Sequence, residues 1–227
     1  MMPAMRAVVN VSVGAWYPAG QDRLGESLQA VDFEGARVFY RNELPETMPR
    51  TAGHVKRAKA YAMAEAAAHY QTLLWADASV WAVRPLGPLF DYIERTGYAV
   101  WDAQQWTVGE WTTDEQARLL SRDRDELMGI PHVHGTLWGV DALSMIGTRI
   151  LDQYVRHAEI GVFGRDLAPG DKGSVDPRVL GQRCDQISLS MIAWDMALAG
   201  LVEGDFYARA LSPRAGGRGV CLIANGI

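Results

Sequence analysis

Strand-like and helix-like segments alternate through the first 80 residues of this chain. Apolar, β-branched runs at 6–13, 36–40 and 72–76 have the length and composition of strands. Between them, residues 21–31 and 54–69 carry apolar side chains at helical spacing. The run at 72–76 is apolar throughout, as in strands that are buried on both faces of a parallel sheet. This order predicts an α/β fold with a mostly parallel central sheet flanked by helices.

The rest of the chain continues the alternation less regularly, with helices expected at 85–95, 112–125, 142–158 and 185–199. Strand-like segments at 98–111 and 132–141 contain tryptophan or glycine, and residues 161–183 form a long glycine-rich loop. No linker divides the chain, so we expect one domain over residues 1–205. Residues 206–227 form a segment rich in glycine and arginine (Arg209, Arg214 and Arg218) that is a candidate lid or, alternatively, a phosphate-backbone contact.

Composition excludes several classes of protein. With 48 % hydrophobic and 22 % charged residues, the 227-residue chain is neither disordered nor fibrous. The net charge of −5 argues against a non-specific nucleic-acid binder. Two cysteines are too few for a disulfide framework and favour a reducing, cytoplasmic setting, and no run approaches the roughly 18 apolar residues of a membrane span. Phosphate-binding loops, dinucleotide fingerprints, zinc-protease motifs and nucleophile elbows are also absent from the sequence.

Asp77 is the most informative polar residue, because it directly follows the buried strand at 72–76. In open α/β sheets ligands bind beyond the carboxyl ends of the strands. A carboxylate there can hold a ribose hydroxyl or a divalent cation. Alternatively, Asp77 caps its own turn, as short acidic side chains often do.

The segment from residue 73 to residue 91 resembles the strand-to-loop signature of GT-A type nucleotide-sugar glycosyltransferases, especially galactosyltransferase-like and glycogenin-like enzymes. In that signature an apolar strand precedes Asp-Ala-Asp, and a Pro-Leu-containing helix follows. Here the match covers residues 73–79, 83–86 and 88–90. The upstream stretch with Lys59 is similar to the family's helix that leads into this strand, whose lysine lies near the donor site.

Two further segments are similar to elements of that family. Residues 181–190 resemble its Asp-Gln element, which opens a helix beneath the sugar, and residues 134–141 resemble its glycine-containing strand beside the sugar. The resemblance implies that Asp185 and Gln186 contact the sugar near the anomeric carbon. Asp185 also suits the first turn of any helix, where the macrodipole favours an acidic residue.

The second acidic position of the family signature is occupied by Ser79. Asp77 is a candidate ligand of a Mn²⁺ or Mg²⁺ cofactor. A hydroxyl is a poor substitute for a carboxylate as a ligand of these ions, so Ser79 argues against a metal here. Basic side chains are the alternative partners of the donor pyrophosphate. The candidates, each of which is otherwise a solvated surface charge, are Lys59, Arg84 and Arg183.

Aromatic and histidine residues supply the remaining candidates. Trp16 and Tyr17 follow the first strand, where the resemblance places the nucleotide base, and they either stack on it or pack the sheet edge. Asp102 and Gln104 are candidates for the sugar or acceptor pocket, and Asp102 and Asp141 join Asp185 as candidate general bases. His132 and His134 share one face of a strand. They are either metal ligands or ordinary polar residues.

The resemblance implies a glycosyltransferase that moves a sugar from a nucleotide diphosphate donor, a UDP-sugar above all. The acceptor is a hydroxyl of a glycan, a protein, a small molecule or a modified nucleic-acid base. The alternative from another class is a non-catalytic carbohydrate- or nucleotide-binding protein on the same fold, which the missing second carboxylate favours. A third alternative is a nucleic-acid-binding accessory protein that uses the clustered tryptophans.

Overall fold

The computed structural model describes residues 5–50, 55–210, 212 and 216–224, apart from the side chain of Gln104. Its main sheet has five strands in the order β2-β1-β3-β8-β5. These strands are β1 (Arg6–Ser12), β2 (Ala36–Arg41), β3 (Thr72–Ala76), β5 (Tyr98–Ala99) and β8 (Leu137–Asp141). The α/β fold expected from the alternating pattern is confirmed.

The sheet is mixed, which corrects the expectation of a mostly parallel one. β1 runs parallel to β2 and to β3, whereas β8 runs antiparallel to β3 and to β5. The chain enters β8 from the short strand β7 (Pro131–Val133), at the edge where Leu137 lies opposite Ala76. Because it arrives at the carboxyl end of β3 without a crossover helix, it can only run back along β3.

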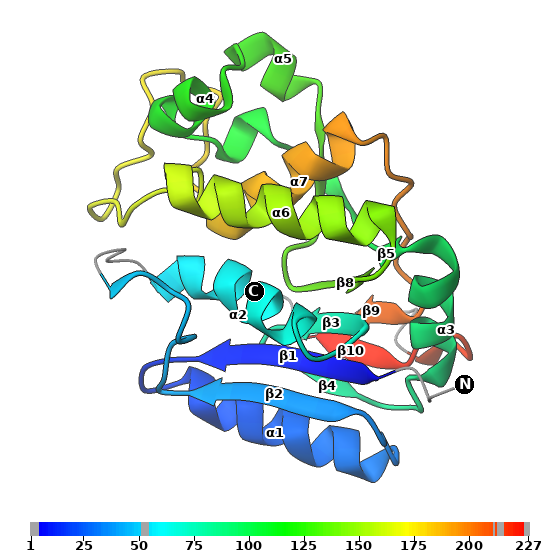
Figure 1. The fold of residues 1–227 in the computed structure, drawn as a ribbon. Coiled ribbons are helices and arrows are strands. Elements are labelled where there is room, and N and C mark those ends of the chain that lie inside the picture. Colours follow the sequence, from blue (N-terminus) through cyan, green and yellow to red (C-terminus); the bar gives the residue numbers. More distant parts are fainter. Residues whose placement is uncertain (1–4, 51–54, 211, 213–215, 225–227) are drawn as a thin grey trace.

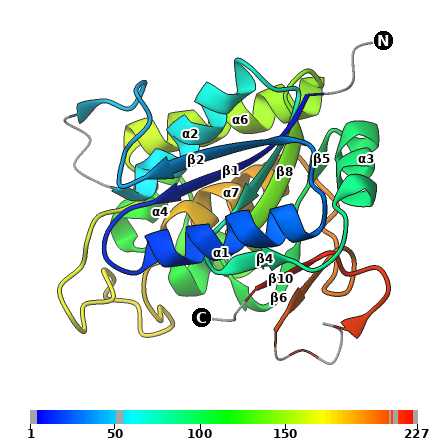
Figure 2. The same ribbon diagram turned by 90° about the horizontal axis from the view of Figure 1, so that it is seen from below.

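Helices cover both faces of the sheet (Figures 1 and 2). Alternate strand residues face opposite layers, so that Val9 and Trp75 join one core cluster and Val8 and Leu74 join the other. The first cluster lies against α2 (Ala58–Ala67), which follows the short helix η2 (Val55–Arg57), and against α6 (Met145–Ile160) and α7 (Cys184–Asp195). The second lies against α1 (Tyr17–Ala30) and α3 (Gly87–Thr96).

Short elements extend the domain beyond the main sheet. β6 (Asp102–Thr107) pairs with β7, and a third apolar cluster lies around η3 (Gly109–Trp111), α4 (Asp114–Leu120) and α5 (Arg124–Met128). β4 (Val80–Ala82), β10 (Leu222–Ala224) and β9 (Tyr207–Arg209) form a separate three-stranded sheet. These three-residue strands are too short to show a period, and for that reason the sequence pattern did not indicate them.

The described part of the C-terminal segment is packed against the domain. β10 pairs with β4, and Tyr207 and Leu222 are buried. Arg84 donates hydrogen bonds to the carbonyl oxygens of Gly217 and Val220, the second at 2.8 Å, so it fastens this segment to the loop after β4. A lid role for residues 206–227 stays a prediction, and Arg214 lies outside the described residues.

Cys184 and Cys221 are both buried and unpaired. Within the described residues, every helix is either too short or too polar to reach across a bilayer. A cytoplasmic location stays a prediction.

Two glycines of α1 provide a matched test of how closely this helix packs on the site loop. A Cβ atom at Gly20 would lie 2.3 Å from the carbonyl oxygen of Ala78, whereas one at Gly25 would meet only the Phe39 ring, at 3.5 Å. We expect Gly20→Ala to destabilise the fold by about 1–3 kcal/mol through overpacking. Gly25→Ala is expected to stabilise it by roughly 0.5–1 kcal/mol, because alanine is the better helix former. Urea denaturation checks both values, and equal effects of the two substitutions would contradict this packing.

Candidate active site

The candidate site lies at the edge of the sheet where the parallel strands β1 and β3 end. Asp77 directly follows β3, and its backbone N–H donates to the carbonyl oxygen of Thr136 at 2.9 Å. Its own carbonyl accepts from the N–H of Val80 at 2.9 Å, which closes a tight turn. The turn holds the Asp77 carboxylate at the strand end, the position that ligands use in open α/β sheets.

Lys59 joins Asp77 to Asp185. Its Nζ lies 3.1 Å from Oδ1 of Asp77 and 2.5 Å from Oδ2 of Asp185, and it donates to the carbonyl oxygen of Gly135 at 2.9 Å. These three contacts use all three donors of the ammonium. The side chain of Lys59 is 10 % exposed, against 32 % for Asp77 and 22 % for Asp185. Both acidic side chains are therefore partly exposed, and the lysine that joins them is more deeply buried.

Aromatic side chains support this triad of Lys59, Asp77 and Asp185. The indole N–H of Trp75 donates to Oδ1 of Asp77 at 2.6 Å, and the ammonium of Lys59 lies 4.7 Å from the centre of the Trp75 ring. The hydroxyl of the fully buried Tyr154 lies 3.5 Å from Oδ2 of Asp185. Tyr154 was not among the residues predicted from the sequence, where its only signal was its place on the buried face of a helix.

Gly135 gives the triad its space. A Cβ atom at this position would lie 3.0 Å from Oδ2 of Asp185 and 3.1 Å from Cβ of Gln186. Both contacts are closer than most Cβ atoms show, so with a side chain here the Asp185 carboxylate or the start of α7 would have to shift by a few tenths of an ångström. The glycine seen in the sequence before β8 is thus part of the site.

Electrostatics keep the ammonium charged. Burial lowers the pKa of Lys59, but the Asp185 and Asp77 carboxylates outweigh burial and leave the pKa above its ordinary value. Burial raises the pKa of Asp77, and the charge of Asp185 adds to this while Lys59 and Trp75 oppose it. In the described part of the chain, Oδ2 of Asp77 and Oδ1 of Asp185 accept no hydrogen bond. These two oxygens are therefore available to the hydroxyl groups of a ligand.

The triad does not fit a divalent cation. The space between the two carboxylates, where a cation would be held, contains the Lys59 ammonium. A dication about 3 Å from that ammonium would be repelled by about 10 kcal/mol at an effective dielectric constant of about 20. Oγ of Ser79 is buried and has no partner within the described residues, so it does not offer a ligand to the solvent side. Within the described ranges, no group of three or more His, Cys, Asp or Glu side chains has an arrangement that could hold a metal ion.

Two further predicted site residues, Gln186 and Asp102, have their contacts outside the triad. Gln186 is buried, and its side-chain N–H donates to the carbonyl oxygen of Val133 at 2.8 Å, which fixes α7 on β7. The Asp102 carboxylate lies against Gly200, where an added Cβ would be 1.8 Å from Oδ1, and burial raises its pKa. Asp141 lies at the opposite edge of the sheet, because it pairs with Thr72 at the start of β3.

Arg183 packs against two tryptophan rings, a contact that was not predicted from the sequence. Its guanidinium carbon lies 4.8 Å from the ring centre of Trp106 and 4.6 Å from that of Trp111. The two indole rings meet edge to face, with their centres 5.6 Å apart. Within the described residues, the guanidinium makes no ion pair and no hydrogen bond, and it lies close enough to Asp185 for the two charges to interact. Arginine and tryptophan were each noted in the sequence, but nothing in their spacing joined them.

Trp16 and Tyr17 lie at the start of α1, beyond the end of β1 at the same sheet edge as Asp77. Trp16 is 87 % exposed and Tyr17 is 62 % exposed. An exposed tryptophan beside a candidate site is unusual for a large apolar ring and suits stacking on a flat ligand. Packing of the sheet edge, the alternative interpretation of this pair, is not what the structure shows.

His132 is a buried neutral histidine. It is fully buried, its Nδ1 lies 2.9 Å from Oγ of Ser190, and its Nε2 has no partner within the described residues. Burial lowers its pKa to about 3, with the positive charges of Arg183 and His134 adding to the effect. The unfolded chain takes up this proton below about pH 6.5. The folded chain does not, so stability is present above pH 6.5 and is lost as the pH falls toward 3.

We therefore expect His132→Asn, which can keep the contact with Ser190, to weaken the acid sensitivity of the fold. The free energy of unfolding of the variant relative to wild type should rise by on the order of 2 kcal/mol between pH 7.5 and pH 4.5. Urea denaturation at a series of pH values measures this difference. A difference that is constant over the whole range would show that His132 titrates normally.

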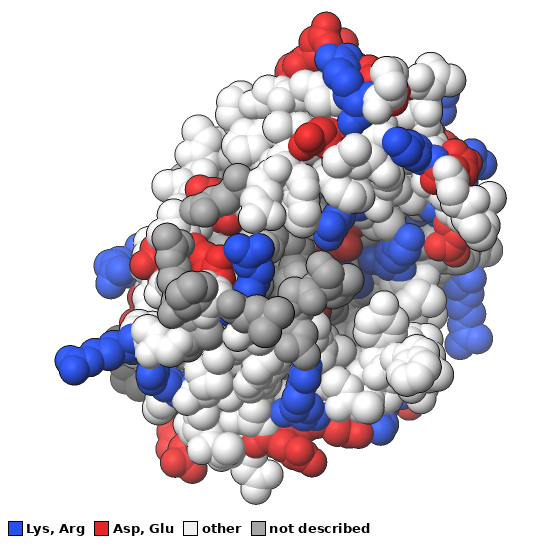
Figure 3. All heavy atoms as spheres, turned by 180° about the vertical axis from the view of Figure 1, so that it is seen from behind, with Lys and Arg blue, Asp and Glu red and all other residues white. Residues whose placement is uncertain are grey.

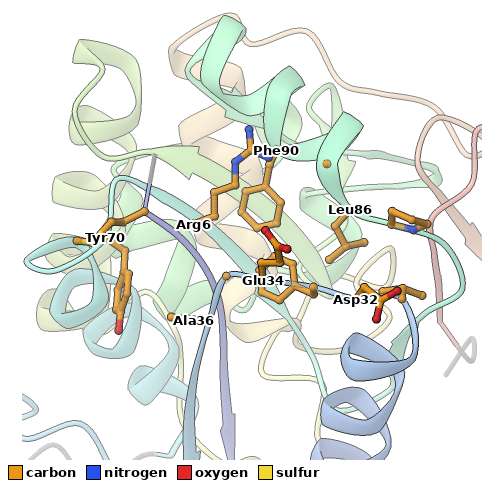
Figure 4. A pocket seen from close by; sticks show the side chains of 13 residues that line it. Arg6, Asp32, Glu34, Ala36, Tyr70, Leu86 and Phe90 are labelled. Atoms are coloured by element: carbon orange, nitrogen blue, oxygen red, sulfur yellow. The ribbon is translucent and has the colours of Figure 1, made fainter. Parts of the chain in front are cut away.

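A separate cavity lies away from the triad. It has a volume of about 730 Å³ and is lined by Arg6 and Ala36, which begin β1 and β2, and by Phe90 of α3 (Figure 4). It thus opens at the amino ends of the parallel strands, opposite the edge that carries Asp77. Arg6 is paired with Glu94 at 2.7 Å and lies over the Phe90 ring. This cavity is therefore separate from the triad.

No family model matches the sequence, and the search of curated proteins found no match either. A solved structure is similar over 98 % of this chain and 94 % of its own: a glycosyltransferase involved in the glycosylation of the major capsid of PBCV-1. The TM-score is 0.53 and the sequence identity is 9 %. The chain has a glycosyltransferase-like fold. At this identity the likeness concerns the fold alone, and the roles of the site residues belong to the proposal below.

Proposed function

We propose that this protein is a GT-A type glycosyltransferase that transfers a sugar from a nucleotide diphosphate donor, a UDP-sugar above all, to an acceptor hydroxyl. The observation that carries the proposal is the triad at the carboxyl edge of β3. There two partly exposed carboxylates each keep one oxygen that accepts no hydrogen bond from the described residues, at the sheet edge that also carries the exposed rings of Trp16 and Tyr17. The glycosyltransferase-like fold supports the same reaction class, as an analogy of fold.

The nucleotide part of the donor binds at the ends of β1 and β3. The base stacks on Trp16 or Tyr17, whose rings are exposed there. The free Oδ2 of Asp77 accepts a hydrogen bond from a ribose hydroxyl. Trp75 and Lys59 hold the other oxygen of this carboxylate, so its orientation is fixed before the donor arrives.

The sugar lies over the start of α7. Asp185 accepts from a sugar hydroxyl through its free Oδ1, and its negative charge stabilises the positive charge that develops at the anomeric carbon. Gln186 holds the helix in place through Val133. In the reaction the acceptor oxygen bonds to the anomeric carbon while the bond from that carbon to the phosphate oxygen breaks. The nucleoside diphosphate leaves with the bonding electrons, and the proton of the acceptor hydroxyl is released to the solvent.

A non-catalytic nucleotide- or carbohydrate-binding protein on this fold is the second candidate, because Ser79 replaces the second acidic residue. A measurement of turnover distinguishes the two functions, because only the transferase consumes its donor. The nucleic-acid alternative has less support. Basic and acidic side chains are interspersed on the face in Figure 3, and Arg209 of the C-terminal segment is paired with Glu203 at 3.0 Å.

Thermal unfolding with a panel of UDP-, GDP-, dTDP- and CDP-sugars tests the proposal. A donor at about 100 times its dissociation constant adds roughly 2.7 kcal/mol of stability. For a domain of this size that corresponds to a rise in Tm of about 5–10 °C. We expect one nucleotide class to give this shift and Trp16→Ala to reduce it. The absence of a shift with every member of the panel would exclude a nucleotide-sugar donor.

A further inference from the structure

The charge balance at the triad leads to an inference about how the donor phosphates are held, and it rests on the proposed function. A nucleotide diphosphate brings negative charge to a site where Asp77 and Asp185 already carry two negative charges. In the structure Lys59 offsets one of these, and all three of its donors are used by protein oxygens. Another positive group must therefore contact the phosphates.

We propose that the diphosphate binds without a divalent cation, because Lys59 fills the place between the carboxylates and Arg183 supplies the contact to the phosphate oxygens. Lys59 is only 10 % exposed and is held from three sides, so its removal from this place would leave two neighbouring carboxylates without the positive charge between them. Ser79 adds no anionic oxygen that would favour a metal over the ammonium.

Arg183 is the basic residue whose surroundings suit this contact. The rings of Trp106 and Trp111 lie against its guanidinium and fix its direction without using its N–H donors. It is half-buried and lies two residues before Asp185, so it can reach a phosphate group beside the sugar. A planar guanidinium with free N–H groups binds two phosphate oxygens at once. Arg84, the other candidate, instead donates to the backbone of residues 217–220.

The test measures binding of UDP, GDP, CDP and dTDP by calorimetry, in EDTA and in 1 mM Mn²⁺ or Mg²⁺. We expect at least one nucleoside diphosphate to bind in EDTA, with a Kd that either metal changes by less than about threefold. Arg183→Gln should weaken this Kd about tenfold or more, the typical loss of a charge-assisted hydrogen bond. It should leave the weaker binding of the parent nucleoside, which has no phosphate, unchanged. Arg37→Gln is the matched control, since Arg37 is exposed on β2, away from the triad.

A second variant tests, by thermal stability alone, whether Lys59 occupies the place of a divalent cation. In Lys59→Ala the two carboxylates lack their ammonium, so millimolar Mn²⁺ should raise the Tm of this variant and leave that of wild type unchanged. Binding of the nucleoside diphosphate only with metal, or at least tenfold tighter with it, would overturn the inference while leaving the proposed function intact. An unchanged Kd for Arg183→Gln would overturn it as well. If no nucleoside diphosphate binds under any condition, the proposed function fails and this inference fails with it.

Discussion

Lys59→Met is expected to lower the free energy of unfolding by about 2–4 kcal/mol at pH 7, since removing one partner of a buried ion pair leaves the other charge unpaired. Two carboxylates and the Gly135 carbonyl would lose their donor together. The corresponding fall in Tm is about 5–15 °C for a domain of this size. The partial exposure of Asp77 and Asp185 keeps the effect below that of a fully buried pair.

The matched control is Lys56→Met, one turn earlier in the chain. Lys56 is 40 % exposed and pairs with Asp166 at 3.4 Å, so we expect a loss of at most about 1 kcal/mol. The deficit of Lys59→Met should shrink as the pH falls toward 4. Burial raises the pKa of Asp77 and Lys59 opposes this, so without the ammonium the pKa of Asp77 rises further in the folded state and protonation then favours folding. Equal stability of the two variants at pH 7 would mean that the Lys59 contacts contribute nothing.

Asp185→Asn is expected to lower the turnover number by about 10²–10³-fold, because the variant loses the negative charge beside the anomeric carbon. The Kd of the nucleoside diphosphate should change by less than about threefold, since Asp185 contacts the sugar and not the nucleotide. Release of nucleoside diphosphate from the donor identified in the stability panel measures the first value, and calorimetry measures the second.

Two further variants serve as comparisons for the loss of turnover expected in Asp185→Asn. Asp77→Asn should instead weaken the binding of the nucleoside diphosphate, because Asp77 holds the ribose. Asp195→Asn, at the far end of the same helix, removes an exposed partner of Arg122 and should leave turnover unchanged. Turnover that survives in Asp185→Asn would remove this residue from the reaction. A wild-type protein that binds donor without any turnover would instead support the binding-protein alternative.

The periodicity of the sequence predicted the layers of the fold. The apolar run at 6–13 predicted a strand, and this is confirmed as β1, whose successive residues Val8 and Val9 face opposite cores. The position of Asp77 directly after an apolar strand predicted its place at the ligand edge of the sheet. These features are local, because hydrophobic burial sorts side chains by their spacing within a single element.

Only the tertiary structure decided which of the predicted residues meet. Lys59 and Asp185 are 126 residues apart, and their contact depends on the packing of α2 and α7 on the same face of the sheet. The antiparallel direction of β8, which sends Asp141 to the opposite edge, depends on where the chain enters the sheet. The contact of Arg183 with Trp106 and Trp111 depends on how the start of α7 lies against β6 and η3. Long-range packing sets all three, and no window of local sequence contains both partners of such a contact.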